Sequence, residues 1–334
     1  MVKKILLGLL ALVLIVVLAL FIYVQTGWDR TYDVAYPELQ SSTDSAVVAQ
    51  GAYLVNGPAH CGGCHVANIE DMIRASKGEE TSLKGGVRFT MGPLGAVYPK
   101  NLTPDAETGI GRYSDGEIFR MMRHVVKPNG QSTITPMMPF WNMADDDMIA
   151  VVSYLRSLEP VRHEVPEPDW TFMGKAIKAV SPTFKPILNP NPPAKAPPME
   201  ATIERGEYLA RYVANCVGCH TPRDPMTFEA IGPDFSGGME MEPFPELHVA
   251  LNVSPDLWTR SPNLTPYANS VMSKFPTLES WKTRFHQGRI IPHSPMDWSA
   301  FGRMTDEDMA AIYLFLRSLD PVENDIEEVV FKKG

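Results

Sequence analysis

All four cysteines of this 334-residue chain lie in two Cys-x-x-Cys-His motifs, at residues 61–65 (CGGCH) and 216–220 (CVGCH). Two cysteines three positions apart lie about one helical turn apart, and the histidine that follows can turn its ring to the same side. The two thiols can then form thioethers with the two vinyl groups of one haem while the histidine ligates the iron, so the motif is typical of covalent haem c. We therefore predict two haem c groups, attached through Cys61, Cys64, Cys216 and Cys219, with His65 and His220 as proximal iron ligands.

Other cysteine chemistry explains these motifs less well. A zinc site built from both pairs would require the long intervening chain to fold into one knuckle, and it would leave the adjacent histidines without a role. A thioredoxin-like dithiol expects a βαβ pattern beside the motif, and the sequence has none. Structural disulfides would also leave the histidines unexplained.

The sixth ligand of each iron decides the function, because a strong second ligand makes an electron carrier and an open position permits binding or chemistry. Met138 lies in a proline-rich loop (PMMP) before the last helical segment of the first half, and Met296 lies in the equivalent loop (SPM) of the second half. We predict these two methionines as distal ligands. Met137 is the alternative to Met138, and we prefer Met138 because it directly precedes Pro139.

Histidine alternatives for the sixth position are His124 and His286, which occupy matching helical positions in the two halves. We expect each to be an ordinary hydrogen-bonded helical histidine. Four other histidines have no counterpart in the other half, and we expect them on the surface or in loops: His60, His163, His248 and His293.

The sequence begins with an unbroken apolar run at residues 5–24, preceded by Lys3 and Lys4. As a helix this run is about 30 Å long, the thickness of a bilayer's hydrocarbon core. A cleaved signal peptide is the alternative, but its apolar region is usually shorter and ends in small residues, whereas this run closes on FIYV. The positive-inside rule places Lys3 and Lys4 in the cytoplasm and the rest of the chain outside it. We predict a single-pass protein of the bacterial inner membrane with its folded part in the periplasm.

The two motifs belong to a duplicated layout. Matching segments precede, follow and end the two halves: 51–54 (GAYL) with 206–209 (GEYL), 101–104 with 263–266 (both NLTP), and 145–160 with 306–321. A tandem duplication predicts five parts: an anchor at 1–28, a domain at 46–160, a proline-rich linker at 161–199, a second domain at 200–322 and a tail at 323–334.

Apolar residues recur at spacings of three and four in the segments that end both halves, so these segments are predicted helices. Further helices are predicted at 46–56, 115–125, 204–215 and 278–287. Thr305 with Asp308 resembles a capping box, and Asp145 or Asp146 would cap the equivalent helix of the first half. Few strands are expected, so the predicted fold class is all-α, with each domain wrapping one haem.

Composition limits the partners. Apolar residues make up 44% and charged residues 21% of the chain, which is typical of a globular protein. The formal net charge is −9, so the chain has no basic footprint for nucleic acid, and the excess of acid favours a basic docking partner.

Several further motifs accompany the first Cys-x-x-Cys-His site. They are Gly85-Gly86, a Pro-x-Gly-x-x-Tyr turn at 93–98, NLTPDAETGIG at 101–111, Met-Pro-Phe at 138–140 and YLRSL at 154–158. With these motifs the first half resembles the class I c-type cytochromes found as haem subunits of membrane-bound alcohol, aldehyde and gluconate dehydrogenases, and the related stand-alone dihaem cytochromes. The second half shares the haem motif, Asn-Leu-Thr-Pro, Met296 and the closing FLRSL, but lacks Thr-Gly-Ile-Gly.

The resemblance implies two histidine- and methionine-ligated haems that relay single electrons. Family members in dehydrogenases usually carry three haem sites, so two sites and an N-terminal anchor favour a membrane-tethered dihaem carrier. Its donor would be quinol-linked or a dehydrogenase complex, and its acceptor a terminal oxidase, a reductase or a soluble carrier. We expect no substrate chemistry of its own. The alternatives are a dihaem peroxidase with one open haem, and a gas sensor, which would need a signalling domain.

Overall fold

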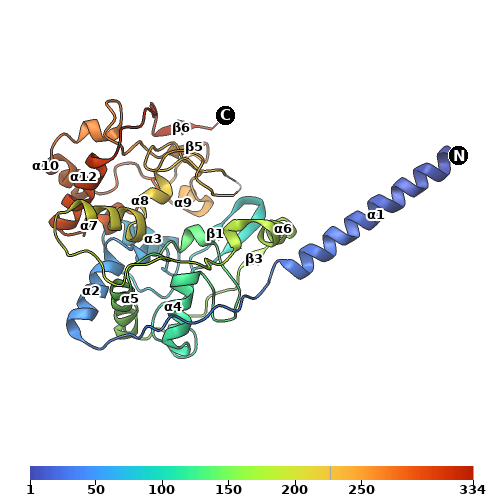
Figure 1. The fold of residues 1–334 in the computed structure, drawn as a ribbon, viewed down its shortest axis with the longest axis horizontal. Helices are drawn as coiled ribbons and strands as arrows, with labels where there is room; N and C mark the ends of the chain where they lie inside the picture. Colours follow the sequence, from blue (N-terminus) through green and yellow to red (C-terminus); the bar gives the residue numbers. More distant parts are fainter. Residues whose placement is uncertain (226, 334) are drawn as a thin grey trace.

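In the computed structural model, which describes residues 1–225 and 227–333, one long helix projects from a folded body (Figure 1). This helix, α1 (Val2–Gly27), follows the apolar run, and its side chains are exposed except near its end, where Val24 and Gly27 are buried. By length and composition α1 could cross a membrane or serve as a signal sequence. The structure thus places the predicted anchor outside the folded body.

The first half is built on a crossing of two helices, α2 (Ser45–Asn56) and α5 (Asp145–Ser157). The crossing is close because Gly51 lies against the main-chain carbonyl of Ala150, where any Cβ would collide. Of two further helices, α4 (Asp115–His124) packs on α5, and α3 (Ile69–Ser76) packs beside the turn at Cys61–Gly63. A full capping box between Ser114 and Glu117 begins α4.

The second half repeats this crossing with α7 (Ile203–Tyr208) and α12 (Asp306–Ser318). Gly206 lies against the carbonyl of Ala311, as Gly51 does against that of Ala150. The helix predicted at 204–215 is divided, because a π-helical turn at Leu209–Val213 follows α7. The remaining helices are α8 (Cys216–Cys219), α9 (Pro245–Ala250), α10 (Leu278–His286) and α11 (Trp298–Phe301).

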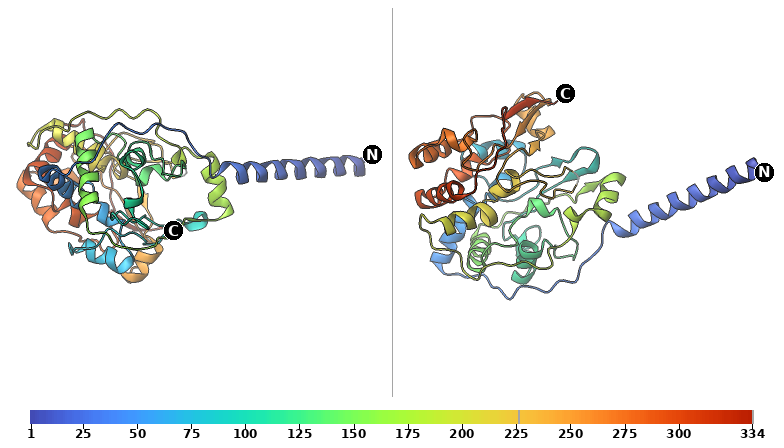
Figure 2. Two further views of the ribbon diagram at one scale, coloured as in Figure 1. Left: turned by 90° about the horizontal axis from the view of Figure 1, so that it is seen from below. Right: turned by 45° about the horizontal axis from the view of Figure 1, so that its top comes forward.

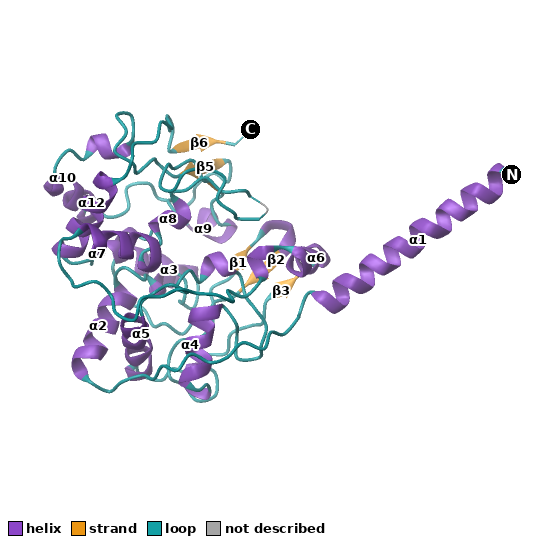
Figure 3. Cartoon of the chain, in the orientation of Figure 1, coloured by secondary structure: helices purple, strands orange, loops and turns teal. Residues whose placement is uncertain are grey.

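Two small antiparallel sheets correct the all-α prediction (Figure 3). The chain is mostly helical, but each half carries a three-stranded sheet whose third strand comes from a segment predicted as linker or tail. The strands are β1 (Phe89–Thr90), β2 (Gly95–Val97) and β3 (Asp169–Trp170) in one sheet, and β4 (Glu240–Met241), β5 (Leu257–Arg260) and β6 (Val330–Lys332) in the other. These strands have two to four residues, too few to show alternation in the sequence.

The proline-rich segment between the halves is an ordered strap. After β3 it forms α6 (Phe172–Val180), and its later part runs along the first half, where it is hydrogen-bonded to His124, Asn142 and Asp146. One hydrophobic core joins both halves, since Leu54 and Val152 of the first belong to the same buried cluster as Leu209 and Leu316 of the second. Figure 2 shows the halves packed together from two further directions.

The predicted caps of the two closing helices differ in outcome. Thr305 caps α12, because its hydroxyl accepts a hydrogen bond from the amide of Asp308. The Asp308 carboxylate does not complete the capping box, because it accepts hydrogen bonds from Arg205 and Tyr53 instead. The prediction that Asp145 or Asp146 caps α5 is wrong: Ala144 occupies that position, without a side-chain hydrogen bond. Both aspartates lie in the first turn, where their charge still favours the helix dipole.

Candidate functional site

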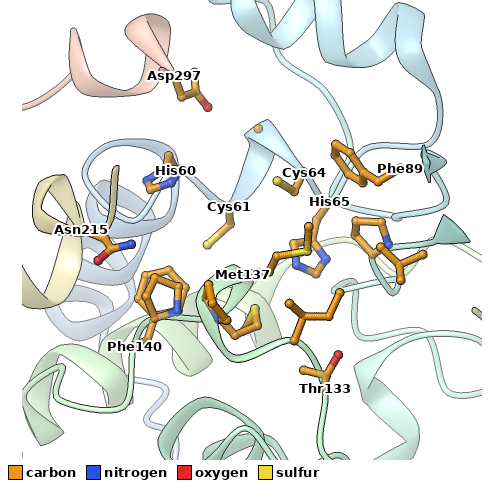
Figure 4. Close-up of a pocket in the computed structure, with 18 of the residues that line it drawn as sticks. His60, Cys61, Cys64, His65, Phe89, Thr133, Met137, Phe140, Asn215 and Asp297 are labelled. Atoms are coloured by element: carbon orange, nitrogen blue, oxygen red, sulfur yellow. The ribbon is translucent and has the colours of Figure 1, made fainter. Parts of the chain in front are cut away.

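The first Cys-x-x-Cys-His motif forms a tight turn at the edge of a large cavity. Residues Cys61–Gly63 form one turn of 3-10 helix, entered through His60 in the left-handed backbone region with φ 41°. Cys61, Cys64 and His65 all line the cavity, and Figure 4 shows them along one wall of it. The short turn therefore presents two thiols and an imidazole to one space, as thioether attachment requires.

A main-chain contact fixes the His65 ring. Its Nδ1 lies 2.8 Å from the carbonyl oxygen of Lys100, which can only accept, so Nδ1 carries the hydrogen and donates. Burial lowers the pKa of His65 and outweighs this hydrogen bond, which by itself would raise it. The lowered pKa favours the neutral ring with its Nε2 lone pair available, and a carbonyl bound to the other ring nitrogen is typical of a metal-ligating histidine.

The second motif repeats this arrangement. Asn215 enters α8 in the left-handed region with φ 50°, as His60 enters the first turn. His220 Nδ1 lies 2.8 Å from the carbonyl of Pro262, and burial lowers the pKa of His220 as it does that of His65. Both imidazoles are thus held in the same tautomer by equivalent contacts.

The repeated Asn-Leu-Thr-Pro segments hold the loops that carry these acceptor carbonyls. Asn101 Oδ1 accepts from the amide and the hydroxyl of Thr103, and its Nδ2 donates to the carbonyl of Val161 at 2.8 Å. Asn263 makes the same bonds to Thr265 and to the carbonyl of Val322. Both asparagines are buried, so the segment that marked the duplication in the sequence serves to position each histidine.

The surroundings of the thiols do not favour a redox dithiol. Burial, then the neighbouring cysteine, raises the pKa of Cys61 and of Cys216 to about 12. Burial, then Asp297, raises the pKa of Cys64 to about 12. A reactive dithiol needs the opposite shift. No disulfide joins the four cysteines, and residues 1–225 and 227–333 contain no group of three or more histidine, cysteine or carboxylate side chains that could hold a metal ion.

The cavity has a volume of about 1930 Å³, well above the ~300 to 1,000 Å³ of an ordinary small-molecule pocket. Both halves line it, because the second motif reaches it through Cys219. Its wall is largely apolar around the first motif, with Phe89, Ile134 and Phe140 among the lining residues. Space, paired thiols and a fixed imidazole therefore fit a covalent haem at the first motif.

The structure brings Met138 into the same cavity as the first motif, but Met137 lines it too. Met137 is 45% exposed, while Met138 is half-buried against the core. In the second half, Pro295 and Asp297 line the cavity and Met296 packs partly buried against the core between them. Both methionine assignments remain predictions.

Of the histidines considered as alternatives, His124 is hydrogen-bonded as expected, with Nδ1 2.7 Å from the carbonyl of Ile187, and His286 is exposed on α10. His293 lies in a loop, as expected, but it is not on the surface. Its side chain is only 5% exposed, and both ring nitrogens are buried without a hydrogen-bond partner among the described residues. The sequence gives no signal for this, because the surrounding loop is rich in proline and polar residues.

Two cavity features were missed in the sequence. Asp297, which directly follows Met296, reaches across from the second half to the first motif, where it contacts Gly63 and would clash with any larger side chain there. Lys178 and Trp170 of the strap also line the cavity. Both depend on contacts between distant segments, which no local pattern indicates.

Residues 48–159 match the family model described as Cytochrome c. The first Cys-x-x-Cys-His motif, its fixed imidazole and helices α3, α4 and α5 lie within this match, so this part of the chain is a cytochrome c domain, and such a domain implies covalent haem c.

The chain is also similar to named cytochromes over more of its length. It is 30% identical to the alcohol dehydrogenase (quinone) cytochrome c subunit of Gluconacetobacter polyoxogenes, over 84% of this chain and 57% of that protein. It is 31% identical to the gluconate 2-dehydrogenase cytochrome c subunit of Pantoea cypripedii, over 54% of this chain and 39% of that protein. It is 26% identical to a diheme cytochrome c-type protein of Cereibacter sphaeroides, over 49% of this chain and 54% of that protein.

The chain thus spans about half the length of the curated relatives it matches. The dehydrogenase relatives are named as cytochrome c subunits, so the similarity is to electron-transfer components rather than to catalytic subunits. The resemblance seen in the sequence is confirmed.

Proposed function

We propose that this protein is a membrane-anchored dihaem cytochrome c that transfers single electrons on the periplasmic side of a bacterial inner membrane. The observation that carries the proposal is the repetition, in both halves, of one Cys-x-x-Cys-His turn whose imidazole is fixed by a carbonyl at 2.8 Å. A single motif would arise more easily by chance. Two motifs with matched histidine tautomers support one covalent haem in each half.

The residues of the chain have distinct tasks in this proposal. The four cysteine sulfurs would hold the two haems, and His65 and His220 would ligate the irons through Nε2. Met138 and Met296 would supply the second protein ligand of each iron, and a methionine ligand raises the reduction potential relative to a second histidine. Each bound haem supplies a one-electron couple. The protein supplies ligands, burial and a docking surface, and needs no catalytic residue.

Partner and location follow from the relatives and from α1. Relatives named as cytochrome c subunits of alcohol and gluconate dehydrogenases support a dehydrogenase as electron donor. A terminal oxidase or a soluble carrier would accept the electron. Lys3 and Lys4 at the start of α1 support a cytoplasmic N-terminus and a folded part outside the cytoplasm.

The test is a haem count with optical spectra of the full-length protein extracted from membranes. We expect two covalent haems by intact mass, and reduced low-spin spectra that carbon monoxide leaves unchanged. Cys64→Ser and Cys219→Ser variants should each retain only one haem that is attached through two thioether bonds. A mass showing one haem in the unsubstituted protein would refute the dihaem proposal. The dihaem peroxidase alternative predicts instead that one of the two haems binds carbon monoxide readily.

A further inference from the structure

The exposed face of α6 is apolar. Phe172, Met173 and Val180 are 52%, 53% and 60% exposed, whereas Gly174, Lys178 and Ala179 on the other side of the helix are buried. Large apolar side chains grouped on one face of a surface helix mark a contact surface. In the described part of the chain more than half of each of these three side chains stays exposed, although Phe21 of α1 contacts Phe172.

This helix packs beside the end of α1, as both views of Figure 2 show. The rings of Phe21 and Phe172 stack with centroids 5.8 Å apart and planes 13° from parallel. A Cβ on Gly27 would lie 3.6 Å from Ala179 Cβ. The N-terminal end of α6 is therefore level with Phe21, and its C-terminal end is level with Gly27.

The level of Phe21 sets the depth of α6 in a membrane. Phe21 belongs to the apolar run at residues 5–24, about 4.5 Å inside its end at ~1.5 Å per residue. If this run spans the hydrocarbon core, Phe172 lies at the hydrocarbon boundary and Met173 lies next to it. Val180, at the other end of the helix, lies nearer the headgroups.

The polar groups around this junction suit the same level. The ammonium group of Lys175 lies 4.7 Å from the ring centroid of Trp28, and the Arg30 guanidinium lies 5.9 Å from that of Tyr23. Aromatic rings with lysine and arginine beside them are typical of the membrane–water interface, where long basic side chains extend toward the headgroups.

We propose that α6 is a second membrane contact, inserted at its N-terminal end into the lipid interface beside α1, with lipid as the occupant of its exposed apolar face. This inference rests on the proposed membrane anchor and adds a fixed orientation to it. On the opposite side of α6, Ile177 and Lys178 line the cavity of the first Cys-x-x-Cys-His motif. The docked helix thus turns this wall of the cavity toward the membrane, while α10 and α12 lie at the far end of the molecule (Figure 1).

The test uses the full-length haem-loaded protein in nanodiscs of phosphatidylcholine and phosphatidylglycerol. Single nitroxide labels are attached at Met173→Cys and Val180→Cys, since the native cysteines are held as thioethers. For each label we compare the collision rate of the nitroxide with oxygen, which concentrates in lipid, and its collision rate with a water-soluble nickel chelate. Leu314→Cys on α12, 40% exposed, is the aqueous control, and Leu14→Cys within α1 is the bilayer control. The haem spectrum of each variant checks that it is folded.

We expect the oxygen-to-nickel ratio at position 173 to exceed that at position 314 severalfold, with position 180 between them. If the ratios at positions 173 and 180 equal the ratio at position 314 while position 14 gives the ratio of a bilayer-embedded site, the α6 contact is refuted and the anchor stands. If position 14 also reads as aqueous, or if intact mass shows that the N-terminus has been removed, the proposed anchor fails and the α6 contact fails with it.

Discussion

Tyr208 in the second half donates a 2.8 Å hydrogen bond to the carboxylate of Asp147 in the first half. The equivalent residues make the reciprocal bond, because Tyr53 in the first half donates to Asp308 in the second at 2.6 Å. Each phenol oxygen also accepts a hydrogen bond from the amide of the N-cap residue of the facing helix, which is Ala144 for Tyr208 and Thr305 for Tyr53. The two halves therefore meet like the subunits of a twofold dimer, in an isologous interface within one chain.

The symmetry of this interface is broken at one position. Asp308 is bound by the guanidinium of Arg205, at 2.8 and 2.9 Å, in an ion pair that is almost completely buried. The residue equivalent to Arg205 is Gln50, whose uncharged amide donates to Asp147 at 3.2 Å. Asp308 is thus paired directly with Arg205, whereas Asp147 is affected by the charge of Arg205 only at longer range.

The tyrosine pair gives a first prediction. Burial raises the pKa of Tyr53 and of Tyr208, with the facing carboxylate adding to the shift, so both remain neutral donors. We expect Tyr208→Phe to lower the free energy of unfolding by about 1.5 to 3 kcal/mol, because a buried carboxylate loses a hydrogen bond. Urea unfolding followed by far-UV circular dichroism measures this, with Tyr53→Phe as the matched variant. A change within 0.5 kcal/mol for both would contradict a structural role of the interface.

The asymmetry gives a second prediction. Arg205→Met should destabilise the protein by about 3 to 5 kcal/mol, because it leaves Asp308 buried without a counter-ion. Gln50→Met should cost less, about 1 to 3 kcal/mol, since only a neutral donor is lost. The double variant Arg205→Met, Asp308→Leu removes both charges and should recover most of the loss. Failure of the double variant to recover stability would show that packing, not charge, explains the cost.

The third prediction concerns pH. Burial raises the pKa of Asp147, which outweighs the hydrogen bond from Tyr208. A carboxyl with a raised folded-state pKa contributes stability below its unfolded pKa, and this contribution is lost as pH rises through the folded pKa. Asp147→Asn cannot titrate, so its stability relative to the unsubstituted protein should rise from pH 4 toward pH 7.

Asp115 provides a control of opposite sign. Burial opposes ionisation there, but hydrogen bonds from Ser41 and Arg156 outweigh it and lower the pKa of Asp115. Its contribution is present above the unfolded pKa and is lost as pH falls through the folded pKa. Asp115→Asn should therefore lose stability relative to the unsubstituted protein as pH rises over the acid range. Parallel pH profiles for the two variants would refute the assigned directions.

The fourth prediction concerns the glycines at the two helix crossings. Gly51→Ala and Gly206→Ala each place a Cβ against a main-chain carbonyl that cannot move without its helix. Each should cost at least about 1 to 3 kcal/mol, the range for overpacking, although alanine is the better helix former. Gly8→Ala in α1, where a Cβ meets no atom within 4 Å, is the neutral control. Unchanged stability in both crossing variants would mean that the helices are farther apart than in the structure.

Local patterns in the sequence identified what local forces decide. The helices at Ser45–Asn56, Asp115–His124 and Leu278–His286 begin and end within about a residue of their predicted bounds, because apolar periodicity and caps specify them. The sheets were not predicted, since β3 and β6 exist through pairing with strands far away in the chain. The Tyr208–Asp147 bond and the position of Asp297 beside Gly63 depend on the packing of the two halves, which no single segment encodes.

The last prediction separates the two candidate methionines of the first half. Met137 and Met138 both line the cavity, so position alone does not choose between them. Met138 packs partly against the core and directly precedes Pro139, whose fixed φ restrains the loop, whereas Met137 is 45% exposed. We expect Met138→Ala to convert one of the two haems to a form that binds carbon monoxide, since losing the sixth ligand opens the iron. Met137→Ala should leave the reduced spectrum unchanged under carbon monoxide, and Met296→Ala should open the other haem. A spectrum in which Met137→Ala, and not Met138→Ala, opens the iron would reverse the assignment, and the exposed sulfur would then have to turn inward when haem is bound.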